Sequence, residues 1–427
     1  MNEIKTKLIN AVKGGLTPSL GVTEPGAIAY AASCAARALG GSVKRVSVRL
    51  NSGIYKNSFT CAVPGTDGIG CALAAALGAV CGKPERRLMA TEGASEADIA
   101  EAEQLVARGL AVSELASISP DILIEAEVET ELGKASATVK GRHDRLTELV
   151  VNGVITLSEA DDASVITDET AVSSFSLKDI LDCVEEASDI EFLDEAVNMD
   201  MELYAEGRRR GLMPLTDSRC AGLSDSCRLT AERITCGAIE ARVRGAAAPA
   251  MAITGSGSHG IISMLPIHGA ALCIGADKDV ERRSLLLSAL ITKYIKELSG
   301  LLSTACGCVL AGGTGAALGL TYLYSKHGEK SVSRGELASR LTNALNSMAA
   351  SVTGMICHGG NTGCSLKAAV GVNMAFAAAR MAQNGFGAEC IHGILGKTPE
   401  ETMRNMGRIA RDMLPVESTV VDIMRCK

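Results

Sequence analysis

The sequence contains no tryptophan, and aromatic residues make up only 3% of its 427 residues, although 47% are hydrophobic. The core must therefore be built from Ala, Leu, Val, Ile and Gly, and side chains of that size suit closely packed helices. A chain of this length can bury a large core and is long enough for two domains.

Long apolar runs and clusters of basic residues are also lacking. The apolar stretches, such as residues 71–81, are too short and too often interrupted by glycine to span a bilayer. The formal net charge is −7 with both signs dispersed, so the sequence predicts neither a membrane nor a nucleic-acid partner. Fifteen scattered cysteines without a recognisable secretion signal indicate free thiols in a reducing cytoplasm rather than disulfides.

Hydrophobic periodicity predicts an α+β protein. Alternating apolar residues over 46–50, 124–128 and 135–139 indicate strands, and antiparallel sheets allow such a pattern because one face can meet water. We expect a turn at residues 51–53, a further strand over 59–63, and one more strand over 150–157 around an Asn-Gly turn. Helices are expected at residues 3–13, 27–39 and 67–81.

Beyond Ser176 the helical period dominates. We therefore predict an N-terminal domain with antiparallel strands and helices over residues 1–165. An all-α domain over 166–427 is expected to follow it. The Asp- and Ser-rich residues 160–172 are the expected junction.

Residues 354–364 (GMICHGGNTGC) place Cys357 and Cys364 around a loop too rich in Gly, Asn and Thr to be helix or strand. Upstream, residues 303–308 (STACGC) add Cys306 and Cys308. Buried cysteine is often just a small hydrophobic residue, and chance pairs are expected among fifteen. Neither pair has the C-x-x-C spacing typical of a zinc ribbon. Three thiolates would, however, hold three irons of a 4Fe–4S cluster and leave the fourth iron open.

Residues 255–260 (GSGSHG) match the G-x-G-x-x-G pattern of dinucleotide-binding proteins, with Asp277 twenty residues beyond Gly257. The preceding segment is Ala-rich and contains Pro249, which makes it a poor central strand. The alternative is that the backbone N–H groups and the hydroxyls of Ser256 and Ser258 bind a carboxylate. His259 would then be a titratable group in that site, or else a structural histidine.

Five motifs together resemble the L-cysteine desulfidase family, which is related to the iron–sulfur L-serine dehydratase alpha chain. The most specific is C-[DH]-G-x-x-x-G-C-x-L-K, which spans residues 357–367. The others follow the same order along the chain and are residues 21–25 (GVTEP), 51–57 (NSGIYKN), 63–66 (VPGT) and 255–260.

The resemblance implies a 4Fe–4S cluster held by Cys306, Cys357 and Cys364, with Cys308 as the alternative to Cys306. It also implies substrate contacts from the following residues: Glu24, Asn51, Tyr55, Lys56, Asn57, Thr66, Ser256 and Ser258. The implied reaction is β-elimination from a small L-amino acid without pyridoxal phosphate. L-Cysteine, giving sulfide, ammonia and pyruvate, is the simplest substrate, and L-serine is the nearest alternative. A non-catalytic cluster-binding protein and a nicotinamide-dependent oxidoreductase are the alternatives of other classes.

The sequence departs from the family pattern at the expected base. The desulfidases carry a cysteine directly before Thr-Glu-Pro, where this chain has Val22, which cannot take a proton. His358 follows the first ligand where the family usually has Asp, and Asn361 stands where Lys is usual. The groups left for acid–base work are His259, His358, Lys56 and Cys61, of which the two histidines titrate nearest neutral pH. Related enzymes also suggest a homodimer.

Overall fold

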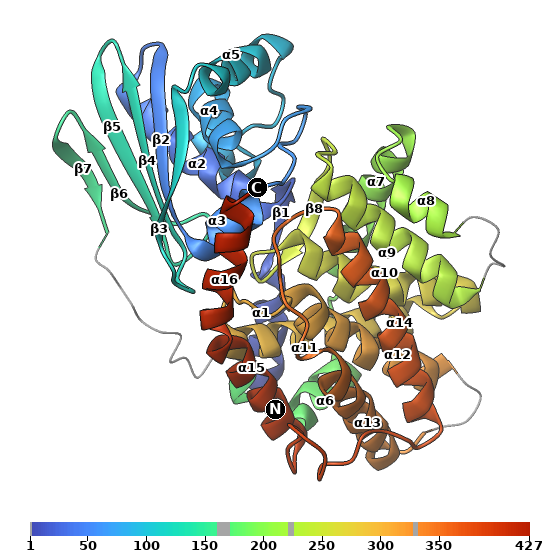
Figure 1. Ribbon diagram of the computed structural model, residues 1–427. Coiled ribbons are helices and arrows are strands. Elements are labelled where there is room, and N and C mark those ends of the chain that lie inside the picture. Colours follow the sequence, from blue (N-terminus) through green and yellow to red (C-terminus); the bar gives the residue numbers. More distant parts are fainter. Residues whose placement is uncertain (1, 160–170, 221–225, 328–331) are drawn as a thin grey trace.

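The computed structural model describes residues 2–159, 171–220, 226–327 and 332–427. Figure 1 shows a sheet flanked by helices in one half of the molecule and a bundle of helices in the other. The α+β class expected from the sequence is confirmed.

The N-terminal half is organised around a six-stranded sheet with the order β3-β2-β4-β5-β6-β7. β2 and β3 run parallel, and every other neighbouring pair is antiparallel. Register places Val48 opposite Ala126 and Ala126 opposite Ala137, so the small apolar residues stack on one face. The strands are β2 (Val43–Asn51), β3 (Ala111–Ser117), β4 (Leu123–Thr130), β5 (Gly133–Lys140), β6 (Leu146–Val151) and β7 (Val154–Ser158).

Helices α2 (Thr23–Leu39), α4 (Cys71–Cys81) and α5 (Glu96–Ala107) lie beside the sheet. α2 packs against α4, where a Cβ on Gly78 would lie 2.3 Å from the carbonyl oxygen of Ala29. Such close contact between helix backbones requires small residues, as the scarcity of aromatic residues predicts.

The C-terminal half consists mainly of helices around the long apolar α10. Its helices are α6 (Leu177–Glu186), α7 (Phe192–Arg209), α8 (Pro214–Cys220), α9 (Cys227–Val243), α10 (Gly257–Ile274), α11 (Lys278–Ser299), α12 (Thr314–His327), α13 (Arg334–Val352), α14 (Gly363–Gln383) and α15 (Pro399–Asp412). Ser176 caps α6 by accepting a hydrogen bond from the backbone N–H of Asp179, as its position predicts. α10 is long and apolar enough to cross a membrane, but 78% of it is buried inside the fold, which is the setting of a core helix.

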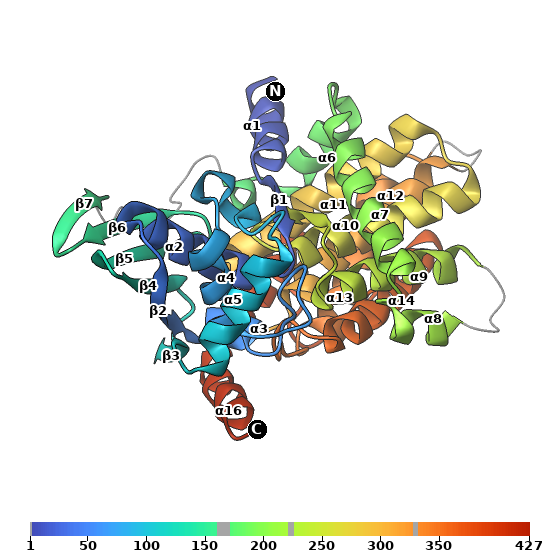
Figure 2. The ribbon, with the colours of Figure 1, turned by 90° about the horizontal axis from the view of Figure 1, so that it is seen from above.

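The N-terminal segment packs against the helical half, and the C-terminal helix packs against the sheet half. Helix α1 (Asn2–Lys13) contacts α6 and α11, and β1 (Leu16–Leu20) pairs antiparallel with β8 (Pro249–Ile253). Helix α16 (Leu414–Arg425) reaches back to α3 (Ser52–Ser58) in the sheet half. Figure 2 shows α1 and α16 projecting on opposite sides of the molecule. The division at residue 165 stays a prediction, because residues 160–170 of the expected junction lie outside the described residues.

Four expectations are wrong, three about local structure and one about the helical half. The predicted turn at 51–53 opens helix α3, and the predicted strand over 59–63 is reduced to one isolated bridge between Ala62 and Ile69. Asn51 redirects the chain, because its side-chain amide donates to the carbonyl of Ser119 and accepts from the N–H of Leu123. Residues 150–157 belong to two strands, β6 and β7, rather than one. The helical half is not all-α, since it contains β8.

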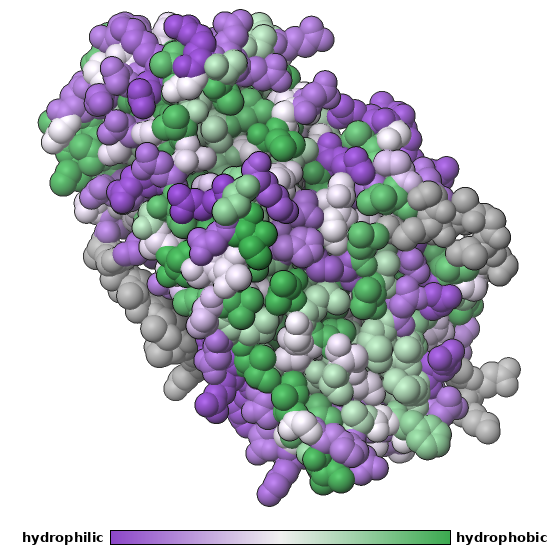
Figure 3. Space-filling model, viewed as in Figure 1, coloured by the Kyte–Doolittle hydropathy of each residue, from purple (hydrophilic) through white to green (hydrophobic). Residues whose placement is uncertain are grey.

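The surface seen in Figure 3 mixes polar and apolar residues over both halves. On α14, the side chains of Leu366 and Val370 are about half exposed, although they lie one turn apart on the same face. The expected homodimer stays a prediction.

Candidate functional site

The two cysteine-bearing segments meet through a short antiparallel bridge between Ala305 and Ile356. The N–H of Cys306 donates to the carbonyl of Met355, and the N–H of Cys357 donates to the carbonyl of Thr304, both at 2.7 Å. Cys306 and Cys357 are thereby fixed side by side, although fifty residues separate them in sequence.

The other two cysteines of these segments lie where helical structure begins. Cys364 stands in the first turn of α14, and its thiol donates to the carbonyl of Gly359 at 3.3 Å. Cys308 opens a short π-helical segment, Cys308–Gly313, a distortion found frequently at functional sites. A hydrogen bond from the Cys308 thiol lowers the pKa of Cys306, and the same contact, with burial, raises the pKa of Cys308. Cys306 is therefore the member of this pair that favours the thiolate.

Lys367 carries a buried charge toward these thiols. Its side chain is 9% exposed, and its Nζ has no hydrogen-bond partner among the residues that the structure describes. Burial lowers the pKa of Lys367, but the thiolate forms of Cys306, Cys357, Cys364 and Cys308 outweigh it and hold the pKa above its ordinary value. An orphaned ammonium beside four thiols fits an anionic group bound between them, as a cluster with thiolate ligands is.

The thiols suit a cluster better than one metal ion. No three His, Cys, Asp or Glu side chains in the described parts of the chain are arranged to hold a single ion. A 4Fe–4S cluster takes one thiolate per iron, so its ligands surround a cube of atoms instead of converging on a point. Cys306, Cys357 and Cys364, with Cys308 beside Cys306, are the candidate ligands for such a cluster.

Asn57 connects the N-terminal half to the second cysteine loop. Its side-chain amide donates to Glu24 at 2.7 Å, and the thiol of Cys357 lies 3.7 Å from its side-chain oxygen. The N–H of Gly360 donates to the backbone carbonyl of Asn57 at 3.1 Å. Helices α2 and α3 thus hold the loop through one asparagine.

Lys56 holds the same loop through a buried ion pair. Its Nζ lies 3.0 Å from the Glu417 carboxylate of α16 and 3.4 Å from the carbonyl oxygen of Cys357. Burial lowers the pKa of Lys56, but Cys357 and Glu417 raise it more, so the pKa is above its ordinary value. A lysine held as an ammonium is suited to binding the loop rather than to removing a proton.

His259 stands in the first turn of α10 with one ring nitrogen turned toward the thiols. Its Nδ1 lies 2.9 Å from the Thr254 hydroxyl, and that hydroxyl donates to the carbonyl of Ile253. The hydroxyl oxygen must therefore accept from Nδ1–H, which leaves Nε2 as an acceptor. A Cβ on Gly307, between Cys306 and Cys308, would lie 2.7 Å from this Nε2. Burial lowers the pKa of His259 well below its usual range, which favours the neutral ring and makes it a weaker base than a free imidazole.

Lys296 on α11 approaches the same point. Its Nζ would lie 3.1 Å from a Cβ on Gly307 and donates to the carbonyl of Leu301 at 3.2 Å. Burial lowers the pKa of Lys296 to about 8, although the nearby thiols oppose this shift. Two basic nitrogens therefore face the backbone between Cys306 and Cys308, where glycine leaves room for them.

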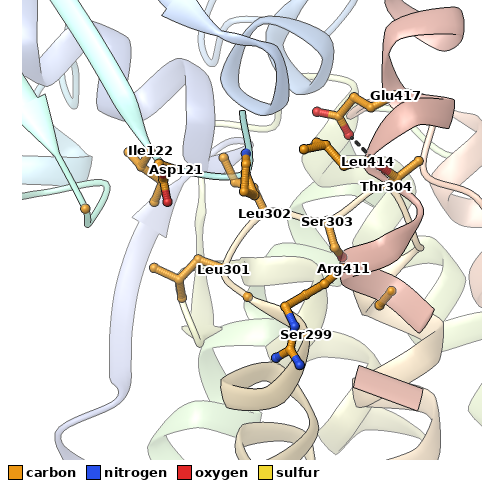
Figure 4. Close-up of a pocket in the computed structure, with 14 residues that line it drawn as sticks. Asp121, Ile122, Ser299, Leu301, Leu302, Ser303, Thr304, Arg411, Leu414 and Glu417 are labelled. Carbon is orange, nitrogen blue, oxygen red and sulfur yellow. Dashed lines mark hydrogen bonds between the residues drawn. The ribbon is translucent and has the colours of Figure 1, made fainter. Parts of the chain in front are cut away.

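A cavity of about 300 Å³ opens at the seam between the two halves (Figure 4). Asp121 and Ile122 lie on its sheet side, and Leu301, Thr304 and Glu417 lie on its helical side. The Thr304 hydroxyl donates to Glu417 at 3.2 Å, and its carbonyl accepts from Cys357. Thr304 therefore lines the cavity and also bonds to the segment that carries Cys357.

Other residues expected to contact substrate hold local structure. The Asn51 amide bonds to Ser119 and Leu123, and the Thr66 hydroxyl closes a turn with Val63 and Gly68. The Tyr55 ring packs near Phe59 at 5.4 Å between centroids. These contacts do not reach the thiols.

Ser256 and Ser258 begin α10, and the Ser258 hydroxyl accepts from Arg242 at 2.7 Å. His358 is exposed, and its Nδ1 lies 3.4 Å from the side-chain amide of Asn361. Val22 is 4% exposed, and a Cβ on Gly360 would lie 2.9 Å from it, so Val22 faces the cysteine loop.

Sequence reasoning missed several charged residues of the site, namely Arg242, Lys296, Lys367, His143 and Glu417. A signal was present for three of them, because Lys367 is the last residue of the cysteine motif over 357–367. Lys296 continues the buried stripe Leu285, Ala289 and Thr292 of α11, and Arg242 continues the stripe Ala231, Thr235 and Ala238 of α9. A basic residue in the register of a buried face is rarely there without a function or a partner. Glu417 had no such signal.

Comparisons with known proteins show the family of the chain. Residues 125–420 match the model of the serine dehydratase alpha chain family. A UPF0597 protein of Clostridium botulinum (strain Okra) is 35% identical, and one of Caldanaerobacter subterraneus is 33% identical. Each alignment covers 98% of this chain, with 98% and 97% of the respective relative. The chain therefore belongs to the serine dehydratase alpha chain family.

Proposed function

We propose that this protein is an iron–sulfur-dependent lyase that catalyses β-elimination from a small L-amino acid without pyridoxal phosphate. Membership of the serine dehydratase alpha chain family supports a lyase of this type. The observation that carries the proposal is the group of four thiols around the orphaned Lys367 ammonium, with two basic nitrogens facing it.

Cys306, Cys357 and Cys364 would hold a 4Fe–4S cluster. Bound there, the cluster would supply a Lewis acid through an iron without a protein ligand. His259 is the proposed base, because its Nε2 is a free acceptor in a neutral ring. It would take the proton from the substrate's α-carbon, after which the β-substituent leaves with its bonding electrons. The aminoacrylate that forms then takes up water to give pyruvate and ammonia.

L-Cysteine, which would release sulfide, is the proposed substrate, and L-serine is the alternative. The serine dehydratase family model favours L-serine, whereas the cysteine-loop motif resembles the desulfidases. A nicotinamide-dependent oxidoreductase receives no support from the fold. Residues 255–260 follow β8, which belongs to a two-stranded antiparallel ladder and not to the parallel βαβ unit that the dinucleotide fingerprint requires.

The test is anaerobic reconstitution with iron and sulfide, followed by assays of iron content, visible absorbance, sulfide and pyruvate. Wild-type protein should bind iron and convert L-cysteine or L-serine, and Cys357→Ala should lose most of the iron. Cys183→Ala on α6, another buried thiol, is the matched control and should retain it. Full iron retention in Cys357→Ala contradicts the site. Iron binding without any elimination would favour the non-catalytic alternative.

A further inference from the structure

Arg242 is a buried guanidinium held only by hydroxyl groups. It is 2% exposed at the end of α9, where its Nη1 donates to Ser258 at 2.7 Å and its Nη2 donates to Thr23 at 3.1 Å. Its Nε has no hydrogen-bond partner among the described residues. An arginine can donate five hydrogen bonds in a planar fork that matches a carboxylate, so part of that capacity is unused.

No carboxylate from the described ranges forms an ion pair with Arg242. Glu240 on the same helix is occupied by the backbone of Leu215, by Thr216 and by Arg244. Asp200 lies within electrostatic reach, but it accepts from the N–H of Met251, and burial raises its pKa well above the usual range. A buried charge normally has a partner of opposite sign. No such partner of the Arg242 guanidinium is found in the parts of the chain that the structure describes.

The N-termini of two helices of the site lie beside the Arg242 side chain. α2 starts at Thr23 and α10 starts at Gly257, and neither Val22 nor Ser256 caps its helix through a side-chain hydrogen bond. The partial positive charge at the start of both helices therefore adds to that of the guanidinium. A Cβ on Gly257 would lie 2.7 Å from Arg242 Nε, so glycine brings the backbone of α10 directly to the unpartnered nitrogen.

His143 lies on the other side of the same turn, and its Nε2 lies 4.0 Å from the Glu24 carboxylate. It is 4% exposed, its Nε2 has no hydrogen-bond partner within the described structure, and its Nδ1 would lie 3.0 Å from a Cβ on Gly255. The unpartnered Nε of Arg242 and the Nδ1 of His143 therefore flank the turn of residues 255–257 that leads into α10.

We propose that Arg242, together with the first turns of α2 and α10, binds the α-carboxylate of the substrate. The inference rests on the proposed function and specifies the part of the substrate that is recognised. Ser258, which receives Arg242 Nη1, directly precedes His259, whose Nε2 faces Gly307 between two cysteines. A carboxylate bound at Arg242 would thus bring the α-carbon toward the proposed base. The site would require a free carboxylate and reject the corresponding amide.

Binding and turnover together test this role. L-Alanine has no leaving group, so its binding can be measured by calorimetry without reaction and compared with that of L-alaninamide. Wild-type protein should bind the acid on the order of a hundredfold more tightly than the amide, because the amide leaves the guanidinium unpaired. In Arg242→Gln this preference should disappear, and Arg242→Lys should keep part of it.

Arg244→Gln is the matched control. Arg244 lies two residues along the chain, is paired with Glu240 at 3.1 Å and is about one-third exposed, so its loss should leave the preference unchanged. Kinetics with L-cysteine and L-cysteinamide should show the same loss of discrimination in Arg242→Gln, at unchanged iron content. If Arg242→Gln does not fold, Ser258→Ala keeps the buried charge and should weaken L-alanine binding about tenfold more than L-alaninamide binding.

The outcomes separate this inference from the proposed function. Carboxylate-dependent binding of L-alanine without any elimination would support the role of Arg242 in carboxylate binding and contradict the proposed lyase activity. Elimination with the same acid–amide preference in Arg242→Gln, or equal effects of Ser258→Ala on both ligands, would overturn the role of Arg242. Wild-type protein that binds L-alanine no better than L-alaninamide, or not at all, would overturn it as well.

Discussion

Lys56 and Glu417 form an ion pair of 3.0 Å across 361 residues of sequence, and both side chains are almost completely buried. Glu417 also accepts from the hydroxyls of Ser52 and Thr304. Because Lys56 donates to the carbonyl of Cys357, one carboxylate from α16 fixes parts of both cysteine segments. Helix α16 is therefore a structural component of the candidate site.

Glu417→Gln should destabilise the protein and loosen the cysteine loops. Removing one partner of a buried ion pair leaves an uncompensated charge, here the Lys56 ammonium, at a cost of about 3–5 kcal/mol. Thermal unfolding followed by circular dichroism, with iron content after reconstitution, measures both effects. Glu125→Gln, which removes the exposed Arg49–Glu125 pair, is the control and should cost less than about 1 kcal/mol. Equal losses of stability and iron content in the two variants would show that the buried pair contributes no more than an exposed one.

His259→Ala should lower elimination turnover by roughly a hundredfold or more, the usual contribution of a general base. His268→Ala is the control on the same helix, since His268 bonds to Glu281 at 2.7 Å and lies outside the site. Steady-state rates per bound cluster should fall only in the first variant. Unchanged turnover with a lower unfolding temperature would make His259 a structural residue.

Val22→Cys should increase L-cysteine desulfidase activity. The residue faces the cysteine loop at Gly360, where the desulfidases place the thiol proposed as their base. Sulfide release under anaerobic conditions is the measurement, and Val12→Cys, a buried valine of α1, is the control. An identical rate in wild-type protein and Val22→Cys would mean that another group removes the proton here.

Cys306→Ser should abolish iron binding, whereas Cys308→Ser should retain most of it. The hydrogen bond from Cys308 lowers the pKa of Cys306 and so favours the thiolate at Cys306. Iron is quantified after anaerobic reconstitution of both proteins. The reverse pattern would make Cys308 the ligand.

Glu281 should make the stability of the helical half depend on pH. Burial raises the pKa of its carboxyl group, but hydrogen bonds with His268 and Lys278 lower it more, so the folded pKa is below the ordinary value of 4.5. A lowered folded pKa adds stability above the unfolded pKa that disappears as the pH falls through the folded pKa. Glu281→Gln should therefore lower the free energy of unfolding at pH 7 by roughly 1–3 kcal/mol, which thermal unfolding measures. The difference from wild type should be smaller in acid. Asp412→Asn, in an exposed pair with Arg408, should show no such trend.

Local patterns predicted the parts of the fold that local chemistry determines. The alternation at Ile124, Ala126 and Val128 gave strand β4, and Ser176 marked the start of α6 because its capping partner lies three residues away. Helix α3 was missed because the contacts that form it come from Ser119 and Leu123, about seventy residues later. No local pattern contains that information.

In the candidate site too, some residues could be predicted from local sequence and others could not. Cys306, Cys357 and Cys364 were identified because their glycine-rich loops are unusual and match a family motif. Glu417 and Arg242 were missed because a charged residue on a helix is ordinarily exposed, and only tertiary packing shows that these two are buried. The substrate contacts expected of Asn51 and Thr66 follow the motif and stay predictions, and the hydrogen bonds of both side chains hold local structure.

The position of Glu417 has a consequence for how the protein is made. Synthesis proceeds from the N-terminus, so Lys56 and both cysteine segments leave the ribosome before the carboxylate that joins them. An unfinished chain therefore has an unpaired lysine and a loosely held Cys357 loop. Under the proposed function, Cys306 and Cys357 would reach their final arrangement only when α16 docks, so metal loading would follow the synthesis of Glu417.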